Sequence, residues 1–289
     1  MIININLIMK NHRKKRLANN IKNLSFFKIS NNSEFIIFNG FNSVPSNYKF
    51  SLKKKFNSNF ICILSGFNST NIRIVIGSYK LNLMKTIPIT NLEERYNYLF
   101  KKFNCNSNYI NNSNGNIVIC TNNSDGWHKH RFNIKDIKNI IKIIKKYSNL
   151  KIQLRLHPKD RILYNENLNF KNKIDSILNL HKISLNNNTH NKLLKNSYCF
   201  ITDNSSIGFQ GFVYGIPIFN LFNNDYSESF NFDFSTNNKI FLDPSKINFN
   251  SLPNRKKVLQ KYLPQYFLKE ELYNNDYFFK ILYNYFSNK

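Results

Sequence analysis

From Asn116 onward, short β-rich runs alternate with segments of helical periodicity, and this alternation limits the fold more than any other sequence feature. Apolar runs occupy residues 116–120, 151–156 and 198–202. Between the first two, isoleucines repeat at helical spacing at positions 134, 137, 140, 141 and 144, with lysines on the opposite face. Such alternation is typical of βαβ units. The sequence therefore predicts an α/β fold with a parallel sheet.

The same half of the chain predicts further elements. A helix is expected around residues 173–180, a short strand at 182–184, and a short helix capped by Thr189 that ends at residue 195. A helix should follow from Ser206 to Tyr214, ended by Gly215, and then a strand at 216–221. The remaining tail is predicted to be helical, with aromatic faces suited to packing.

The first part of the chain predicts strands separated by loops. Its apolar runs lie at residues 34–38, 60–64 and 73–76, with a helix expected over 92–103 and an Asn-rich linker over 104–116. We therefore expect domains at residues 1–112 and 113–252, with C-terminal helices, residues 253–289, packing back on the first domain.

The apolar content is high enough for buried hydrophobic cores, and the excess of basic residues favours an anionic partner. Of the 289 residues, 42% are apolar, and 42 basic against 16 acidic side chains give a net charge of +26. The Asn, Lys and Ile bias resembles an A/T-rich codon preference, so two explanations of the charge stay open: codon drift and selection for a basic surface, which the failure of Glu to keep pace with Lys favours. Such a charge attracts nucleic acid, anionic lipid or phosphorylated substrates. No zinc-finger or RNP-type segment is present, so nucleic acid is not the expected partner.

The cysteines and hydropathy indicate a cytoplasmic protein. Cys62, Cys105, Cys120 and Cys199 are widely spaced, lack metal-binding spacing and read as reduced thiols. The apolar start is very short and its charges follow it, unlike a secretory signal, and no run approaches a membrane span. We expect peripheral contact with an anionic inner membrane surface through basic faces.

Two predicted strand ends carry the chemistry. The first is Arg155-Leu156-His157-Pro158-Lys159, and the second is Asp203-Asn204-Ser205-Ser206, with Gly208 and Gly211 close behind. Ligands of parallel sheets bind outside the carboxyl ends of strands, where helix N-termini present free N–H groups to anions. The first run offers the imidazole of His157 and two cationic side chains. The second run offers serine hydroxyls as donors, and its glycines allow a phosphate to approach the backbone closely. The alternative is that the first is a simple turn and the second a helix cap.

These two runs, followed by Gly215-Ile216-Pro217-Ile218-Phe219, resemble the C-terminal half of GT-B transferases with cytidine-nucleotide donors. That group includes capsule polysaccharide Kdo transferases, sialyltransferases with HP and SS motifs, and teichoic-acid glycerophosphotransferases. The resemblance covers about residues 116–222. It implies two Rossmann-like halves, an N-terminal acceptor side and a C-terminal nucleotide-donor side. It also implies donor-phosphate roles for His157, Ser205 and Ser206, to which we add Arg155 and Lys159, with backbone contributions from Asn204 and Gly208.

This chain departs from the pattern after the serines. Members of the group carry Glu-Ala or Phe-Asp there, whereas Phe209-Gln210-Gly211 stands here. A carboxylate that would touch ribose or base is missing, so the donor identity stays open. The N-terminal half matches no pattern that we can name.

A general base must accept the proton of the acceptor hydroxyl. The run Ser124-Asp125-Gly126-Trp127-His128 follows the first strand of this half and resembles an acidic-Gly motif of some sialyltransferases. We take Asp125 as the base and His128 as its reserve; a turn anchored by Trp127 is the alternative. His130 and Arg131 are candidates for binding the donor phosphates. We expect His181 and His190 to be surface or helix-cap residues.

Three functions remain open from the sequence. The first is a transferase moving a Kdo- or sialic-acid-like sugar from a CMP-linked or related donor to a surface polysaccharide or glycolipid. The second is a polyol-phosphate transferase using a CDP-glycerol-type donor. The third is a non-catalytic basic binding protein with a degenerate transferase fold. No DxD-like pair is present, so we expect neither a metal nor a cofactor, and phosphate charge would be offset by cationic side chains and helix dipoles.

Overall fold

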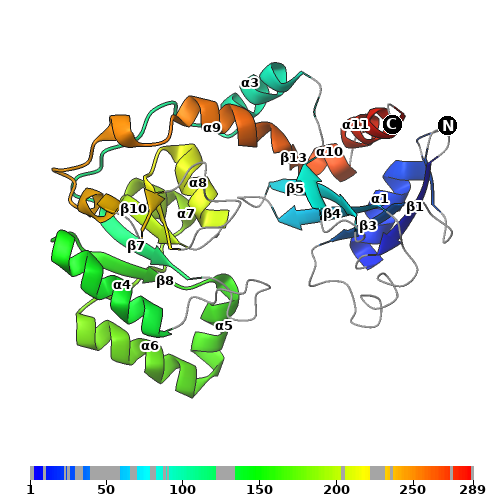
Figure 1. The fold of residues 1–289 in the computed structure, drawn as a ribbon. Helices are drawn as coiled ribbons and strands as arrows, with labels where there is room; N and C mark the ends of the chain where they lie inside the picture. The colour runs from blue at the N-terminus through cyan, green and yellow to red at the C-terminus, as the bar shows by residue number, and fades with distance from the viewer. Residues whose placement is uncertain are drawn as a thin grey trace. The chain divides into compact units, whose positions relative to one another are not determined.

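The computed structural model of the chain forms two compact units, residues 1–99 with 260–289 and residues 100–259. Figure 1 labels many of their helices and strands. The structure describes residues 3–8, 11–22, 24, 27–29, 35–39, 59–65, 70–78, 83–86, 89, 91–121, 134–202, 206–221, 232–234, 237–273 and 276–287.

The second unit contains a parallel sheet with the order β12-β11-β10-β7-β8-β9. Every pair of neighbouring strands in it runs parallel. The strands are β7 (Asn116–Cys120), β8 (Ile152–Arg155), β9 (Ser184–Leu185), β10 (Ser197–Thr202), β11 (Ile218–Asn220) and β12 (Phe232–Asp233). The predicted α/β class is thereby confirmed.

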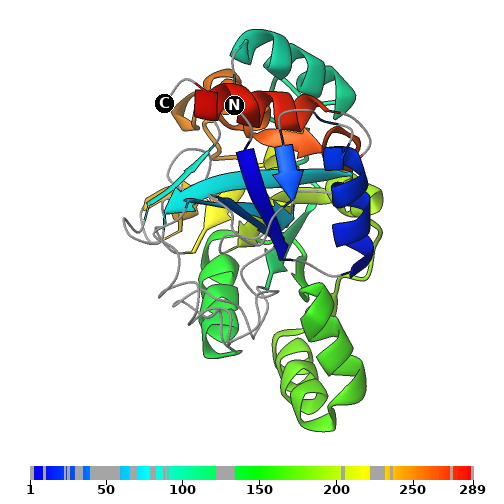
Figure 2. The same cartoon turned by 90° about the vertical axis from the view of Figure 1, so that its right-hand side faces the viewer.

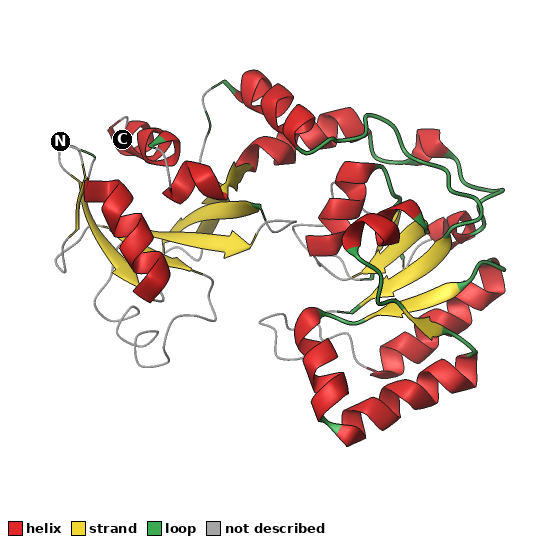
Figure 3. Ribbon diagram, turned by 180° about the vertical axis from the view of Figure 1, so that it is seen from behind, coloured by secondary structure: helices red, strands yellow, loops and turns green. Residues whose placement is uncertain are grey.

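Helices connect these strands and bury the sheet on both faces, which explains the continuous apolar run of β10. They are α4 (Ile134–Tyr147), α5 (Pro158–Glu166), α6 (Leu168–His181), α7 (His190–Lys195) and α8 (Ser206–Tyr214). Isoleucines of α4 and α6 pack with β7 and β8 in one cluster, whereas α8 lies against β10 and β11. Figure 3 shows helices, in red, on both sides of the yellow strands of this sheet. All six residues of β10 are buried.

The strand order places a topological switch point between β7 and β10. The chain runs from β7 outward to β8 and β9, crosses back to β10 and continues to β11 and β12. This is the strand order of a Rossmann sheet, in which ligands bind at the carboxyl ends of the strands flanking the switch point. The fold therefore singles out the loops after β7 and β10.

The segment after β8 corrects one sequence prediction. We expected a single helix around residues 173–180, but α5 starts at Pro158 and a second helix, α6, begins at Leu168. The residues of α5 are mostly polar and carry a weak helical pattern. Proline suits a first helical turn, where its missing N–H costs no hydrogen bond. His157 is thus a helix N-cap and not only the end of a strand.

The first unit contains a mixed sheet with the order β13-β5-β4-β3-β1-β2, and β6 pairs with β5. Strands β1 to β4 are mutually parallel, whereas β5, β6 and β13 join by antiparallel pairing. The first four strands are β1 (Ile3–Ile8), β2 (Phe27–Ile29), β3 (Phe35–Asn39) and β4 (Asn59–Ser65). They are followed by β5 (Asn71–Ser78) and β6 (Leu83–Thr86). The predicted strands at 34–38, 60–64 and 73–76 correspond to β3, β4 and β5. Helix α1 (Asn11–Lys22) was not predicted from the sequence.

The C-terminal segment completes this first unit. Strand β13 (Tyr266–Leu268) pairs antiparallel with β5, and helices α10 (Lys269–Tyr273) and α11 (Tyr277–Ser287) follow it. Phe278 and Phe279 are fully buried in the cluster that contains Leu7 and Leu17. Figure 2 shows α11 beside α1 and β1, so segments from the two halves of the sequence share one core. The structure also contains α3 (Leu92–Lys102), close to its predicted span, and α9 (Arg255–Tyr262).

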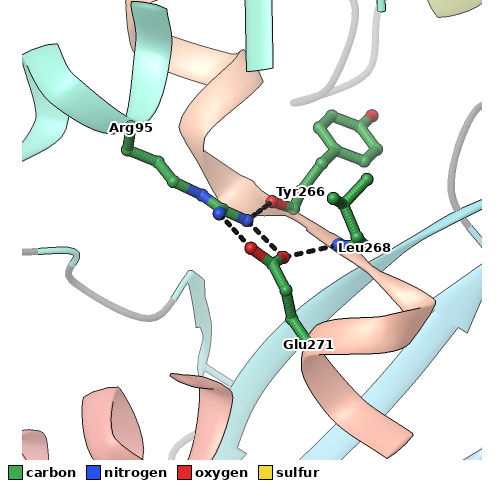
Figure 4. Close-up of polar contacts among 4 residues, drawn as sticks. All are labelled: Arg95, Tyr266, Leu268 and Glu271. Atoms are coloured by element: carbon green, nitrogen blue, oxygen red, sulfur yellow. Dashed lines mark hydrogen bonds and ion pairs between the residues drawn. The ribbon is translucent and has the colours of Figure 1, made fainter. Parts of the chain in front are cut away.

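A buried ion pair fixes this C-terminal segment. Arg95 of α3 donates to both carboxylate oxygens of Glu271 and, at 2.7 Å, to the carbonyl of Tyr266, while the Leu268 N–H donates to Glu271 Oε2 at 2.6 Å (Figure 4). The Arg95 and Glu271 side chains are 4% and 8% exposed. Further hydrogen bonds make a buried ion pair tolerable, and here the two terminal guanidinium nitrogens of Arg95 and both carboxylate oxygens of Glu271 have partners.

Candidate functional site

Residues at the carboxyl edge of the second unit's sheet lie in one row across its strands. Arg155 is in register with Cys120, Cys120 with Thr202, and Thr202 with Asn220. The carboxyl ends of parallel strands share one edge, so the segments that follow β8, β7 and β10 begin from the same line. Both sequence motifs, after β8 and after β10, start at this edge.

His157 occupies the N-cap of α5 and lies half-buried at this edge. Its N–H donates to Thr121 Oγ1 at 2.9 Å, and its carbonyl accepts from the Arg161 N–H at 2.9 Å. Its ring Nδ1 accepts from the Lys159 N–H at 3.3 Å. Imidazole thus takes the place that a Ser, Thr or Asp side chain fills at most helix N-termini.

This capping bond assigns the ring's tautomer. Because Nδ1 is an acceptor, the proton of neutral His157 lies on Nε2, which remains the ring's donor. Burial lowers the pKa of His157, the nearby Asp160 carboxylate raises it, and the Lys159 ammonium lowers it further. The net lowering favours neutral imidazole. The residue can therefore donate one hydrogen bond to an anionic oxygen.

Beneath His157 lies a buried polar contact that sequence reasoning missed. Thr121, directly after β7, donates its hydroxyl to Asp160 Oδ2 at 3.3 Å while accepting from the His157 N–H. The Thr121 N–H also donates to the Arg155 carbonyl at 3.0 Å. Thr121 and Asp160 are 5% and 4% exposed. The available signal was an aspartate three residues after a potential N-cap, the spacing of a capping box.

Arg155 is held by the loop that follows β9. Its guanidinium donates to Asn186 Oδ1 at 3.2 Å and to the Asn188 carbonyl at 2.9 Å. Arg161 donates to the carbonyl of the same Asn186 at 3.4 Å. Burial lowers the pKa of Arg155. These contacts assign Arg155 a structural role in ordering the loop, and its contact with a donor phosphate stays a prediction.

Among the predicted phosphate ligands that the structure describes, Lys159 and Ser206 are the most accessible. Both side chains are exposed, Lys159 in the first turn of α5 and Ser206 at the first residue of α8. The first turn of a helix presents unsatisfied N–H groups and a partial positive charge. Each residue thus lies in a helix turn where an anion is stabilised, and α8 follows β10, one of the two strands that flank the switch point.

Gly208 and Gly211 serve the packing of α8 on the sheet. A Cβ on Gly208 would lie 2.9 Å from Thr202 Cγ2, and one on Gly211 would lie 2.6 Å from ring carbons of Phe200. Both glycines therefore face β10, and their missing side chains let the helix approach the strand closely. The predicted donor-site role of the Gly208 backbone stays a prediction.

The opposite end of α8 is held by Arg255. Its guanidinium donates to the carbonyls of Phe212 and Val213 and, at 2.6 Å, to the carbonyl of Asn106. It also lies over the rings of Tyr109 and Phe212, 4.9 and 4.6 Å from their centroids. A cation at a helix C-terminus complements the helix dipole. The orientation of α8, and hence of Ser206, is fixed from its far end.

Thr202 places a buried hydroxyl at the switch point. Its side chain is 1% exposed, and among the described residues its Oγ1 has no hydrogen-bond partner. The Gln210 side chain in α8 is 4% exposed, and its Oε1 is likewise unpartnered. Buried polar atoms of this kind cost stability unless a partner reaches them.

Several predicted site residues lie outside the described residues. They are Asp125, His128, His130, Arg131, Asn204 and Ser205. Their roles as base and phosphate ligands remain predictions. His190 is the exposed first residue of α7. Within the described ranges, no group of three or more His, Cys, Asp or Glu side chains could hold a metal ion.

The described cysteine thiols are free. Cys105, Cys120 and Cys199 form no disulfide, and burial raises the pKa of Cys120 to about 12. No helix in the part of the chain that the structure describes is long and apolar enough to cross a membrane.

Comparison with known proteins gives similarity at the level of structure. No protein-family model matches the chain, and no curated protein matches its sequence significantly. The beta Kdo 2,7 transferase KpsC of Thermosulfurimonas dismutans superposes with a TM-score of 0.55 at 12% identity, covering 97% of this chain and 98% of that one. This chain therefore has a GT-B-like α/β fold. The predicted resemblance to Kdo transferases is thereby confirmed for the fold.

Two further solved structures are similar at lower scores. S. aureus MnaA in complex with UDP has 11% identity and a TM-score of 0.33, covering 100% of this chain and 97% of that one. The wall teichoic acid polymerase TagF has 13% identity and a TM-score of 0.32, covering 99% and 88%. At these TM-scores the likeness does not establish a shared fold.

Proposed function

We propose that this chain is a glycosyltransferase that moves a Kdo- or sialic-acid-like sugar from a CMP-linked or related nucleotide donor to a surface polysaccharide or glycolipid. The reaction takes place in the cytoplasm, with peripheral contact at the anionic inner membrane surface. The donor phosphates bind at the carboxyl edge of the second unit's sheet, and no metal or cofactor takes part.

One observation carries this proposal. His157 at the N-cap of α5 and Ser206 at the first residue of α8 follow β8 and β10, the two strands that flank β7. In the proposed site, two helix N-termini, an imidazole N–H and a hydroxyl at this edge of the sheet bind the donor phosphates. This combination of donors suits phosphate oxygens.

The electrostatics of this edge support a metal-independent reaction. Lys159 is exposed in the first turn of α5, and α5 and α8 direct their positive dipole ends toward the same edge. Preorganised donors of this kind stabilise the charge that develops on a leaving phosphate. In the proposed mechanism Asp125, with His128 in reserve, accepts the proton of the acceptor hydroxyl as the new glycosidic bond forms.

A panel of nucleotides tests the proposal. CMP, CDP, UDP, GDP and ADP are added to the purified full chain at physiological salt, and the melting temperature is measured. A ligand at about a hundredfold excess over its Kd adds about 2.7 kcal/mol of stability, which is visible as a melting shift. We expect a shift with cytidine nucleotides that is absent with the others.

The alternatives give different results in the same experiment and its follow-up. With CDP-glycerol and CMP-Kdo as donors, product analysis separates a polyol-phosphate transferase from a sugar transferase. A flat nucleotide panel would overturn the transferase proposal in favour of a degenerate binding protein. Nucleic-acid binding would instead show a steep salt dependence without nucleotide preference.

A further inference from the structure

Thr121 and Asp160 link the N-cap of α5 to the end of β7. In an ordinary capping box, the acidic residue at the third helical position accepts directly from the N-cap N–H. Here the Thr121 hydroxyl stands between the two, accepting from the His157 N–H at 2.9 Å and donating to Asp160 Oδ2 at 3.3 Å. The capping contact is thus relayed through a residue from a neighbouring strand.

This relay has a defined direction. The Asp160 carboxylate accepts, so the Thr121 hydroxyl proton points toward it, and a lone pair of Thr121 Oγ1 remains for the His157 N–H. Both residues of the relay are at least nine-tenths buried. Removing the Thr121 hydroxyl would take away the acceptor of the His157 N–H, and a polar group left without its partner costs more than the bond itself contributes.

The relay acts on the imidazole through the backbone of His157. Holding the His157 N–H fixes the N-cap conformation, which brings ring Nδ1 to 3.3 Å from the Lys159 nitrogen. That contact in turn leaves the proton on Nε2. The strand β7, next to the switch point, therefore sets the direction in which the phosphate-site histidine presents its donor.

We propose that Thr121 and Asp160 are positioning residues that hold His157 in the Nε2–H tautomer, with Nδ1 turned to the α5 backbone. This inference rests on the proposed phosphate-binding role of His157 for its functional consequence, but the tautomer itself is independent of any nucleotide. Neither residue needs to touch the donor.

The test compares Thr121→Val, Thr121→Ser and Asp160→Asn in the full chain. Valine keeps the shape of threonine without its hydroxyl, and serine keeps the hydroxyl. Nitrogen chemical shifts of ¹⁵N-labelled histidines report the tautomer, and a pH titration reports the pKa of the ring. The variant His157→Asn identifies the His157 signals, and circular dichroism shows that each variant is folded.

We expect the native protein and Thr121→Ser to show the Nε2–H tautomer, and Thr121→Val to show a mixture. Asp160→Asn should lower the pKa of His157 further, because the carboxylate raises it against the opposing effects of burial and Lys159. Unchanged nitrogen shifts in folded Thr121→Val would overturn the proposal. So would a mixed tautomer in the native protein.

Nucleotide affinity separates this inference from the proposed function. We expect the Kd of CMP or CDP to rise about tenfold in Thr121→Val, the size expected for losing one well-placed hydrogen bond, and to recover in Thr121→Ser. If the tautomer changes while no nucleotide binds any variant, including the native chain, the proposed function fails and the positioning role stands. If His157→Asn loses affinity but Thr121→Val changes neither tautomer nor Kd, the positioning role fails alone.

Discussion

The two units differ in where they place buried polar groups. In the first unit Arg95 and Glu271 bind each other in a closed pair, lined by the rings of Phe267 and Tyr277 at 5.2 and 4.9 Å from the guanidinium. In the second unit, polar residues follow one edge of the sheet, where His157 is half-buried and Lys159 is exposed. A buried pair whose members bind each other is closed to a ligand and costly to break, whereas half-buried and exposed polar groups are available to a ligand.

The largest expected effect concerns the closed pair. Glu271→Gln leaves the Arg95 guanidinium buried without its counter-charge, so we expect a loss of about 3–5 kcal/mol of stability, measured by calorimetric or chemical unfolding. The exposed pair Lys280–Asp276, at 2.8 Å, is the matched control. Lys280→Ala should cost about 0.5 kcal/mol or less. Equal losses in the two variants would show that burial does not distinguish them.

The second effect concerns the open edge. His157→Ala removes the imidazole donor, and we expect nucleotide affinity to fall by roughly 10- to 100-fold, as for one charge-assisted hydrogen bond, with circular dichroism unchanged. Isothermal titration with CMP or CDP measures it. His190→Ala is the control, since His190 is exposed at the start of α7. An unchanged Kd in His157→Ala would remove this residue from the phosphate site.

The third effect tests the packing beneath that edge. Gly211→Ala places a Cβ 2.6 Å from ring carbons of the fully buried Phe200. Alanine favours a helix over glycine by up to about 1 kcal/mol, but overpacking costs about 1–3 kcal/mol. We therefore expect a net loss in chemical unfolding. A gain in stability would mean that α8 does not approach β10 as closely as described.

The smallest effect is the pH dependence of nucleotide binding. The pKa of His157 lies below its ordinary value, with Asp160 raising it and Lys159 lowering it. A bound phosphate raises that pKa again, so the complex holds more protons than the free protein between the two values, and affinity increases as pH falls through that window. We expect a change of roughly threefold between pH 8 and pH 6.

The ligand's own phosphate titrates near pH 6 as well, so the same titration in His157→Gln supplies the reference. The slope attributed to His157 is the difference between native protein and variant. Identical slopes in both would assign the pH dependence to the nucleotide alone.

The helices and strands with a clear hydrophobic periodicity were predicted most closely from the sequence. The isoleucines of α4, the buried run of β10 and the Gly215 that ends α8 predicted their elements closely. The prediction failed at α5, because residues 158–166 are mostly polar and only the position of Pro158 signals a start. Strand β13 was not predicted either, because its three residues pair with a strand that is distant in sequence and show no local periodicity.

The candidate site was predicted in part for a similar reason. Motifs at predicted strand ends led to His157 and Ser206, and the structure places both at the start of a helix, whereas their phosphate-binding role stays a prediction. Thr121 and Asp160 are 39 residues apart in sequence and meet only through the parallel pairing of β7 with β8. Likewise, the engagement of Arg155 by Asn186 and Asn188 depends on the loop after β9. Tertiary contacts decide which cations remain open to a ligand.

Amide hydrogen exchange with and without CMP or CDP tests the central claim most directly. We expect nucleotide to slow exchange in the first turns of α5 and α8, residues 157–161 and 206–210. The same slowing should be absent in His157→Ala at matched concentration. Slowing confined to residues 1–99 and 260–289, with none at those two helix starts, would contradict a donor site at the carboxyl edge of the second unit's sheet.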